Sequence, residues 1–293
     1  MPVQLTVLAS GSSGNASLLE VHEFGLLIDA GLGPRQIATR LRMAGSSFDR
    51  VHALVLTHTH SDHWTDGALK LALRRRIPVY LHPAHVRQLR LAGCQTIAML
   101  HAGRLLRYYE GGQWLTITSH LRCLPVPVSH DGGPTFGFRF EGEADLFHAG
   151  WSAAYFADLG VWNAETVEAA IDVDLLALEF NHDVEMQRNS GRPARLIDRC
   201  LGDDGHLSNE QAAALLLEAV ARSRSRRLRR VVQLHISRQC NRPALAYQVA
   251  VRALQQLDVP ATVHTAWQHQ PTAALSLIDD EPAAHAASAE RCA

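Results

Sequence analysis

Residues 57–63 read Thr57-His58-Thr59-His60-Ser61-Asp62-His63, and they directly follow the apolar run Val51–Leu56. The run predicts a buried strand, so three imidazoles and one carboxylate lie in the loop at its end, where several side chains can turn toward one point. Imidazole and carboxylate ligands suit Zn, Mn or Fe. The stretch contains no Cys, which argues against a closed structural zinc site. It therefore predicts a metal site of another kind.

This spacing, His-x-His-x-Asp-His, resembles the metal-binding signature of the metallo-β-lactamase superfamily. By that resemblance His58 and His60 bind one divalent cation, and Asp62 and His63 bind a second. The alternative is a histidine-rich surface turn, which requires both the ligand order and the position after a strand to be accidental.

The composition is that of a globular protein. The chain has 293 residues, of which 47% are hydrophobic and 19% are charged. A chain of this size buries roughly three quarters of its unfolded surface, in one large domain or two modest ones. We expect one domain over residues 1–267, followed by an Ala-rich, polar tail over residues 268–293 that is disordered. The formal net charge of -1 gives no overall attraction to nucleic acid, so such binding needs a local basic patch.

Cysteine usage and the N-terminus bear on the cellular compartment. The five cysteines are scattered and form no C-x-x-C pair, so neither disulfides nor a thiolate zinc site is predicted. Met1–Gln4 does not begin a signal peptide, and no apolar run approaches the length of a membrane span. We therefore expect a cytoplasmic protein without a membrane partner, and the sequence does not indicate its oligomeric state.

Strand and helix signals alternate, which predicts an α/β fold. Strands are predicted over residues 3–9, 16–21, 26–28, 51–56, 77–81, 114–119, 120–128, 135–140, 154–157, 171–180, 231–234 and 261–264. Helices are predicted over residues 34–44, 68–76, 83–91, 209–220 and 243–257.

Further candidate metal ligands stand at the ends of later strands. The superfamily resemblance assigns His130, which precedes a Gly-Gly turn, to the first metal and His235 to the second. It also requires a carboxylate that bridges the two cations, and Asp158, followed by Leu159-Gly160, fits that position. Asp145 is the competing candidate.

Several nearby side chains are candidates for supporting roles. Asp29, Asp131 and Glu179 are expected to orient the metal-binding imidazoles, although a Glu179 that is simply buried and bonded to backbone is an alternative. The loop of small residues with Ser12, Ser13 and Asn15 is expected to hold a phosphate, the alternative being a plain turn. Two further candidates for substrate contacts are His182 and Ser208.

His206 lies just before a predicted helix, for which Ser208 is a good N-cap. This location favours an anion, and the imidazole can donate a proton to a phosphate or a leaving oxygen. Two divalent cations supply a shared water of lowered pKa for in-line attack on phosphorus, with Asp158 holding the pair together. The expected catalytic residues are therefore Asp62, Asp158 and His206.

Segments outside the histidine cluster resemble one branch of the superfamily, the bacterial WalJ/YycJ family. They are Val7–Ala16, Asp29–Gly31, Leu178–Asp183, Gly205–Asn209 and His235–Ser237. The resemblance implies the four-layer αββα metallo-β-lactamase fold, two divalent cations and exonuclease activity on double-stranded DNA. The His-Leu-Ser and His-x-Ser elements are also similar to those of the tRNA-processing enzyme RNase Z, which favours a phosphodiester substrate. Ala157 departs from the family pattern, where Thr is usual.

Two other functions use the same ligands. One is hydrolysis of a small ester, lactone or thioester, and the other is metal binding without catalysis. His206 and the arginine-rich segment 188–199 favour nucleic acid, because a small neutral ester needs neither. A second arginine-rich segment, residues 222–230, is equally consistent with a solvated connector. The chain is too short for the extra domain that RNase J-like nucleases insert.

Overall fold

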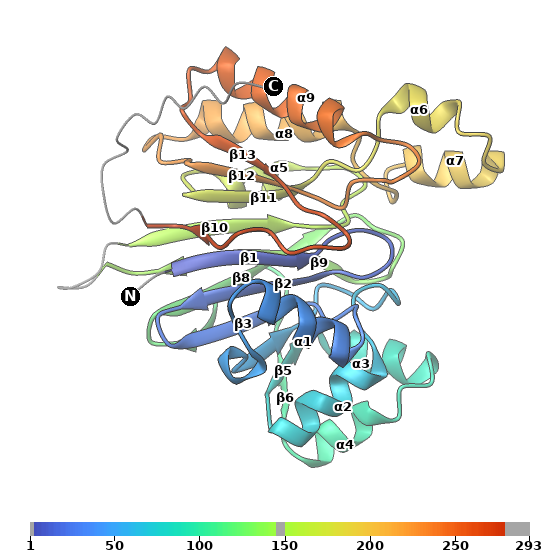
Figure 1. Cartoon of the computed structure of the whole chain (residues 1–293), viewed down its shortest axis with the longest axis vertical. Coiled ribbons are helices and arrows are strands. Elements are labelled where there is room, and N and C mark those ends of the chain that lie inside the picture. The colour runs from blue at the N-terminus through green and yellow to red at the C-terminus, as the bar shows by residue number, and fades with distance from the viewer. Residues whose placement is uncertain (1–2, 145–149, 279–293) are drawn as a thin grey trace, which may run out of the picture.

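The computed structural model describes residues 3–144 and 150–278, and two seven-stranded sheets packed face to face form its centre (Figure 1). The first sheet has the strand order β14 (Leu275–Ser276), β1 (Val3–Ala9), β2 (Ala16–Val21), β3 (Phe24–Ile28), β4 (Ala53–Val55), β5 (Val79–Leu81) and β6 (Leu106–Tyr108). The second has the order β13 (Thr262–Thr265), β12 (Arg230–Leu234), β11 (Leu175–Glu179), β10 (Trp151–Phe156), β9 (Thr135–Gly142), β8 (Leu121–Val128) and β7 (Leu115–Thr118).

Helices cover the outer face of each sheet (Figure 1). The first sheet carries α1 (Pro34–Met43), α2 (Asp66–Arg75), α3 (Pro83–Leu91) and α4 (Thr96–Ala102), with a short 3-10 helix over Phe48–Arg50. The second sheet carries α5 (Ala164–Ala170), α8 (Asn209–Arg222) and α9 (Pro243–Gln256). Two short helices, α6 (Val184–Arg188) and α7 (Ala194–Leu201), project from one end of the sandwich. The expected αββα architecture is thus confirmed.

The central strands of each sheet are buried on both faces. Along β3, Leu26 and Ile28 enter the core between the sheets, whereas Leu27 packs under the helices of the first layer. Successive side chains of a strand point to opposite faces, so a strand covered on both sides must be apolar throughout. This requirement accounts for the continuous apolar runs in the sequence.

The carboxyl ends of the central strands gather the candidate site. β3 to β6 run parallel in the first sheet, and β10 to β13 run parallel in the second. Loops that follow parallel strands meet at one end of a sheet, so residues distant in sequence converge there. The strands β4, β8, β10 and β12 lead respectively into His58–His63, His130, Asp158 and His235.

The structure corrects two of the sequence-based expectations. The strand predicted from residue 171 begins at Leu175, because residues 164–170 form α5 and Ile171 ends it. The expected disorder from residue 268 is wrong for residues 268–278, where β14 pairs with β1 and Leu275 is buried between the sheets. Residues 279–293 and Asp145 lie outside the described residues. Within the described part of the chain, every helix is too short or too polar to cross a membrane.

Candidate metal centre

A cavity of about 340 Å³ opens where the strand ends converge. Imidazoles and carboxylates from five separate segments line it: His60, Asp62, His130, Asp158, His206 and His235. The remaining candidate ligands, His58 and His63, are fully buried beside it. The tertiary structure thus brings together all seven residues that were expected to bind metal.

Three histidines make the first group of candidate ligands. His58, His60 and His130 each offer a ring nitrogen, and these atoms lie within 4.8 Å of one another. His130 Nδ1 donates to the Gly205 carbonyl at 2.9 Å, which leaves the lone pair on Nε2, 3.2 Å from His60 Nδ1. The backbone of Gly205 therefore sets the tautomer of His130.

A second group surrounds Asp62. Its Oδ2 atom lies 3.8 Å from His63 Nε2 and 3.7 Å from His235 Nε2. Asp158 lies between the two groups, because its Oδ2 is 2.5 Å from His63 Nε2 and 3.8 Å from His58 Nε2. Its Oδ1 is 3.1 Å from the ring of His235. A single carboxylate is thus placed to contact both sets of imidazoles.

Unsatisfied buried atoms show that this donor set fits divalent cations. His58 Nε2, His235 Nε2 and both carboxylate oxygens of Asp158 are buried without a hydrogen-bond partner. Buried polar atoms are rarely left unpaired, because each unpaired atom destabilises the fold. Coordination to divalent metal would satisfy these four atoms.

Metal binding requires an ionised carboxylate and neutral imidazoles. Burial lowers the pKa of His63 and of His235, but nearby carboxylates, chiefly Asp29 for His63 and Asp158 for His235, outweigh it and raise both pKa values well above the ordinary value, so these two rings must lose a proton when a cation binds. Burial alone raises the pKa of the Asp158 carboxyl, but the nearby rings of His235 and His63 outweigh it and hold this pKa well below its ordinary value. Burial, aided by the charge of His63, lowers the pKa of His58 well below its usual range.

Two buried carboxylates orient the imidazoles. Asp29 Oδ2 accepts from His63 Nδ1 at 2.7 Å, while Asp29 Oδ1 accepts from the Thr57 amide at 2.8 Å. Glu179 Oε1 accepts from Nδ1 of His206 at 2.8 Å and of His235 at 3.0 Å. Both lie where the sequence analysis expected an orienting carboxylate.

Asp131 is placed differently from the other two orienting candidates. It pairs with Arg199, whose Nη2 donates at 2.9 Å, and its Oδ1 is 3.5 Å from His60 Nε2. The Gly205 carbonyl, not Asp131, receives the Nδ1 proton of His130. Asp131 therefore connects an arginine at the mouth of the cavity to His60.

His206 faces the cavity and is held from behind. Its Nδ1 donates to Glu179, so its Nε2 is the ring nitrogen available to the cavity. The side chain is 18% exposed, which is enough for a substrate atom to reach it. The short distances of Asp158, Glu179 and His235 from this ring also place it in a possible ligand group.

Of the residues expected to hold a phosphate, only Ser12 and Ser13 are exposed, and Ser12 lines the cavity. Asn15, His182 and Ser208 are buried, so the expected phosphate contacts do not fit them. Asn15 Oδ1 accepts from the Gly11 amide of its own loop at 2.8 Å, and its Nδ2 lies 3.3 Å from Asp62 Oδ2 and 3.0 Å from His63 Nε2. Ser208 caps α8.

His182 is also unsuited to bind a phosphate directly. His182 is 1% exposed, and burial lowers the pKa of its imidazole to about 4. A neutral, enclosed ring offers no charge to an anion in solution. His182 was expected to contact the substrate because it follows the end of a strand. Sequence alone does not show which side chains of such a loop turn inward.

Three residues that support the site through hydrogen bonds were not predicted from the sequence. Thr57 bridges Asp29 and the His58 ring, with Oγ1 distances of 2.9 and 3.0 Å. Asn181 donates to the His235 carbonyl at 2.8 Å. Gln268 accepts from the Ser13 amide at 2.9 Å, although it lies in the segment expected to be disordered. Only Thr57 had a local signal, since it directly precedes the histidine cluster.

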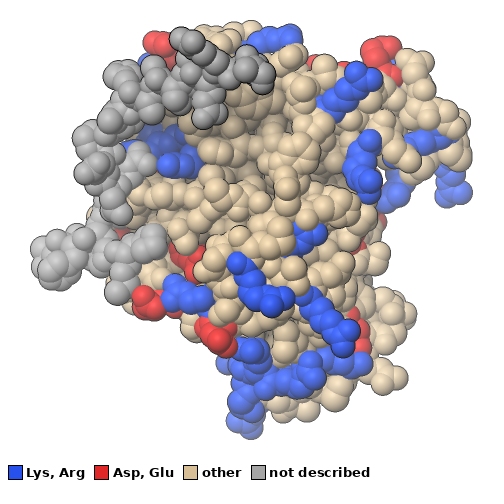
Figure 2. Space-filling view, viewed as in Figure 1, with Lys and Arg blue, Asp and Glu red and all other residues tan. Residues whose placement is uncertain are grey.

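Arginines surround the entrance. Arg192 and Arg199 line the cavity, and Figure 2 shows basic side chains on the projecting α6–α7 segment that carries them. In the segment of residues 222–230, Arg222 pairs with Glu168 at 2.9 Å and Arg227 pairs with Asp174 at 2.6 Å, so these two arginines are engaged away from the cavity. The arginines that line the metal cavity itself therefore come from the α6–α7 segment.

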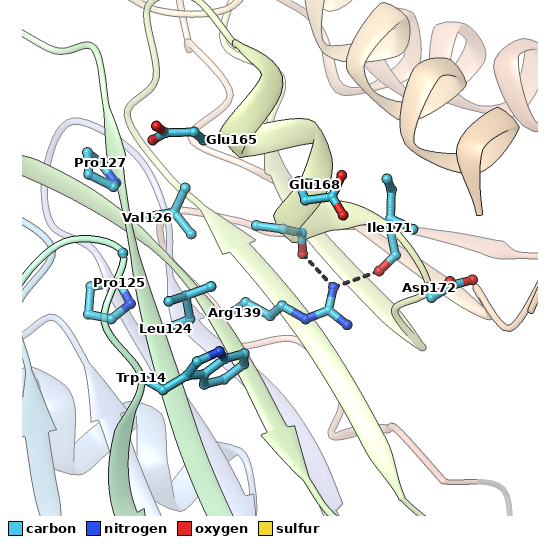
Figure 3. A pocket seen from close by; sticks show the side chains of 12 residues that line it. Trp114, Leu124, Pro125, Val126, Pro127, Arg139, Glu165, Glu168, Ile171 and Asp172 are labelled. Atoms are coloured by element: carbon cyan, nitrogen blue, oxygen red, sulfur yellow. Dashed lines mark hydrogen bonds between the residues drawn. The ribbon is translucent and has the colours of Figure 1, made fainter. Parts of the chain in front are cut away.

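A larger cavity, of about 460 Å³, lies away from the metal centre, between α5 and the strands β8 and β9 (Figure 3). Its walls are mainly apolar, with Trp114, Leu124 and Val126 on one side. Arg139 crosses it and donates to the carbonyls of Ala169 and Ile171 at 2.9 and 2.6 Å. None of the candidate metal ligands lines this cavity.

Comparison with known families agrees with this geometry. A family model described as the beta-lactamase superfamily domain matches residues 25–236, which include every candidate metal ligand. The chain belongs to the beta-lactamase superfamily. The fold and the donor set together make it a metal-dependent hydrolase of that superfamily.

The chain is similar over most of its length to proteins named as exodeoxyribonucleases. It is 30% identical to exodeoxyribonuclease WalJ of Streptococcus pneumoniae, over 87% of this chain and 89% of the relative. It is 26% identical to exodeoxyribonuclease YycJ of Bacillus anthracis, over 75% of this chain and 78% of the relative. The crystal structure of the metallo-beta-lactamase fold protein YhfI from Bacillus subtilis matches with a TM-score of 0.64 and 17% identity, covering 93% of this chain and 99% of that protein.

Proposed function

We propose that this chain is a dinuclear phosphodiesterase that degrades DNA from an end. The observation that carries the proposal is the position of Asp158, whose two unsatisfied oxygens lie between two groups of imidazoles at the floor of an arginine-lined cavity. Two cations about 3.5 to 4 Å apart are the usual arrangement in enzymes that cleave phosphodiesters. The similarity to named exodeoxyribonucleases supports the same substrate.

We assign His58, His60 and His130 to the first cation, and Asp62, His63 and His235 to the second, with Asp158 shared. When bound, the cations supply Lewis-acid stabilisation of phosphate charge and lower the pKa of a nucleophilic water. The ligand types suit Zn or Mn, with Fe as a further candidate, and the soft thiolate ligands of closed zinc sites are absent from the proposed set.

The chain's own side chains position the substrate and move a proton. Arg192 and Arg199 attract the phosphodiester to the cavity, and Ser12, which also lines it, offers a hydroxyl. His206 presents Nε2 to the cavity while Glu179 holds Nδ1, which suits proton transfer to the leaving oxygen. Asp29 and Glu179 keep the tautomers of His63 and His235 correct for binding cations.

A substrate panel tests the proposal. The purified chain, loaded in parallel with Mn and with Zn, is incubated with end-labelled duplex DNA, single-stranded DNA, RNA, a thioester and a lactone. We expect shortening of DNA from an end, and loss of that activity in Asp158→Ala with each metal. A metal-replete preparation that hydrolyses the thioester or lactone and leaves all nucleic acids intact would overturn the proposal.

The role of His206 has its own test. General acid catalysis contributes about 10²- to 10⁴-fold to rate, so His206→Ala is expected to slow DNA degradation by that factor. Because His206 is not assigned to a cation, the metal content per chain should stay near that of the unaltered protein. Loss of metal together with activity would instead make His206 a ligand.

A further inference from the structure

Two more cavities continue outward from the metal centre. The metal cavity shares Ser12, Arg192 and Ser237 with a neighbouring cavity of about 440 Å³. That cavity shares its lining residues Ser237, Arg238 and Gln268 with a third cavity of about 320 Å³. Because each cavity shares lining residues with the next, the three lie side by side in a row that leads away from the metal centre, and we call this row the groove.

The outer groove carries basic and neutral side chains. Arg238 is exposed there, and the guanidinium of Arg192 donates through Nε and Nη2 to the neutral Oε1 of Gln239, at 3.0 and 2.6 Å. Among the described residues that line the second and third cavities there is no Asp or Glu. Both arginines therefore keep their positive charge available to an anion, in a molecule whose overall charge is close to zero.

The groove ends at an exposed aromatic side chain. Trp267 lines the third cavity and is 43% exposed. Its carbonyl accepts from the Ser10 amide at 3.1 Å, and Ser10 Oγ in turn accepts from the amide of the metal-site residue His235 at 2.8 Å. The neighbouring Ala266 amide donates to the Gln233 carbonyl at 2.9 Å. These bonds fix the backbone of Trp267 relative to the metal centre.

We propose that the groove binds a single strand of nucleic acid that leads to the metal centre, with phosphates on Arg192 and Arg238 and an unpaired base stacked on the Trp267 indole. This inference rests on the proposed nuclease function. A line of cations suits a phosphate backbone, and an exposed, backbone-anchored indole suits a base face. Stacking requires a base free of its partner, so the ligand is a single strand in preference to an intact duplex.

The chain contains a matched control for the indole. Trp114 is 44% exposed and also lines a cavity, but that cavity is mainly apolar and includes Glu165 and Glu168 in its lining (Figure 3). None of the candidate metal ligands lines it. A general effect of removing an exposed tryptophan should therefore appear in Trp114→Ala as well as in Trp267→Ala. An effect of the groove should appear in Trp267→Ala alone.

The first experiment measures binding without catalysis. Fluorescence anisotropy follows a labelled single-stranded oligonucleotide and its hairpin duplex as the full chain is added in the presence of a chelator. Loss of one stacked base weakens binding by about 5- to 150-fold, so this loss is expected for the single strand with Trp267→Ala and is not expected with Trp114→Ala. Arg238→Ala should make the slope of log K against log salt less negative by about 0.7, as loss of one phosphate contact predicts.

The outcomes separate the groove from the nuclease function. Equal single-strand affinity in Trp267→Ala and Trp114→Ala, absence of single-strand binding by the unaltered chain, or an equal loss of duplex binding would each overturn the groove proposal. The same variants, loaded with metal, are then assayed on DNA with a single-stranded end. If the unaltered chain degrades DNA and Trp267→Ala does so equally well, only the groove proposal fails; if the unaltered chain degrades no nucleic acid, the nuclease function fails as well.

Discussion

Glu179 Oε1 lies 2.8 Å from His206 Nδ1, and the same oxygen lies 3.0 Å from His235 Nδ1. The second oxygen, Oε2, accepts from the amides of Leu159 and Leu207 at 2.9 and 3.2 Å. One fully buried carboxylate therefore holds the loop after Asp158, the loop of His206 and the end of β12 together. The proposed metal ligand His235 and the proposed proton donor His206 therefore share this support.

Glu179→Gln is expected to lower both stability and activity. Glutamine keeps one acceptor oxygen and replaces the other with an NH2 donor, so either the amides of Leu159 and Leu207 or the Nδ1–H groups of His206 and His235 would face another donor in the interior. Leaving buried donors unpaired costs about 1–3 kcal/mol each. Denaturant unfolding measures the change, with Glu185→Gln on the exposed side of α6 as control. Equal stability of the two variants would contradict the role given to Glu179.

Asp29→Asn is expected to weaken cation binding without removing a ligand. Asp29 accepts the Nδ1 proton of His63, and an amide that donates at this position favours the wrong tautomer. Loss of such a supporting contact typically lowers metal affinity by about 10- to 100-fold. Competition with a chromophoric chelator measures the affinity. Asp49→Asn removes a surface carboxylate paired with Arg75 and should leave it unchanged; a similar affinity for both variants would rule out the positioning role.

Gly31→Ala tests how the metal-binding loop is packed. The Gly31 amide donates to the Asn15 carbonyl at 2.9 Å, and a Cβ on Gly31 would overlap the carbonyl oxygen of Asp62. The loop that carries Asp62 must move to accept the methyl group, so we expect reduced cation affinity and a lower melting temperature. Gly33→Ala, whose Cβ meets only Gln36 at 3.5 Å, is the control. Unchanged metal affinity in Gly31→Ala would show that Asp62 tolerates the shift.

His85 makes stability depend on pH. Its Nε2 donates to the Pro134 carbonyl at 2.8 Å, and burial lowers the pKa of the imidazole to about 4 from an ordinary value of 6.5. Between these values the unfolded chain binds the proton and the folded chain does not. The stability is therefore complete above about pH 6.5 and falls as the pH drops toward 4, by up to about 3 kcal/mol.

The variant His85→Gln keeps a donor for Pro134 and cannot titrate. We expect its stability to fall less than that of the unaltered chain between pH 6.5 and pH 4, measured by urea unfolding across that range. His101→Gln, which removes an exposed histidine, is the control and should follow the unaltered chain. A parallel pH dependence in His85→Gln would mean that the low pKa of His85 does not affect folding.

Local patterns were sufficient where the decisive contacts are close in sequence. The apolar run before Thr57 and the spacing of His58, His60 and His63 predicted both the strand and the loop that follows it. They succeed because a strand exit presents consecutive loop residues to the same end of a sheet. The helix capped by Ser208 was recognised for the same reason, since its capping bonds join residues three positions apart.

Local patterns failed to predict features that depend on packing between segments distant in sequence. The polar residues His182 and Asn15 carry no local mark of burial, because sheet and loop contacts with distant segments enclose them. Residues 268–278 have no apolar period, yet β14 pairs with β1, and Gln268 bonds to Ser13 across 255 positions of sequence. A two-residue strand is stabilised almost wholly by its partner, so its own residues hardly reveal it.

The sequence by itself predicted the type of chemistry: a histidine- and carboxylate-rich site after a buried strand, and, through its resemblance to the superfamily, the αββα fold and the proposed ligands. Tertiary structure decided which polar groups serve that centre. In the folded chain Glu179 bonds both His206 and His235, and the Gly205 carbonyl sets the tautomer of His130. Arg238 and Trp267 line a cavity that neighbours the site. The physical reason is that ligand type depends on the side chain alone, whereas orientation, burial and the shape of a groove depend on strand register and on contacts between distant segments.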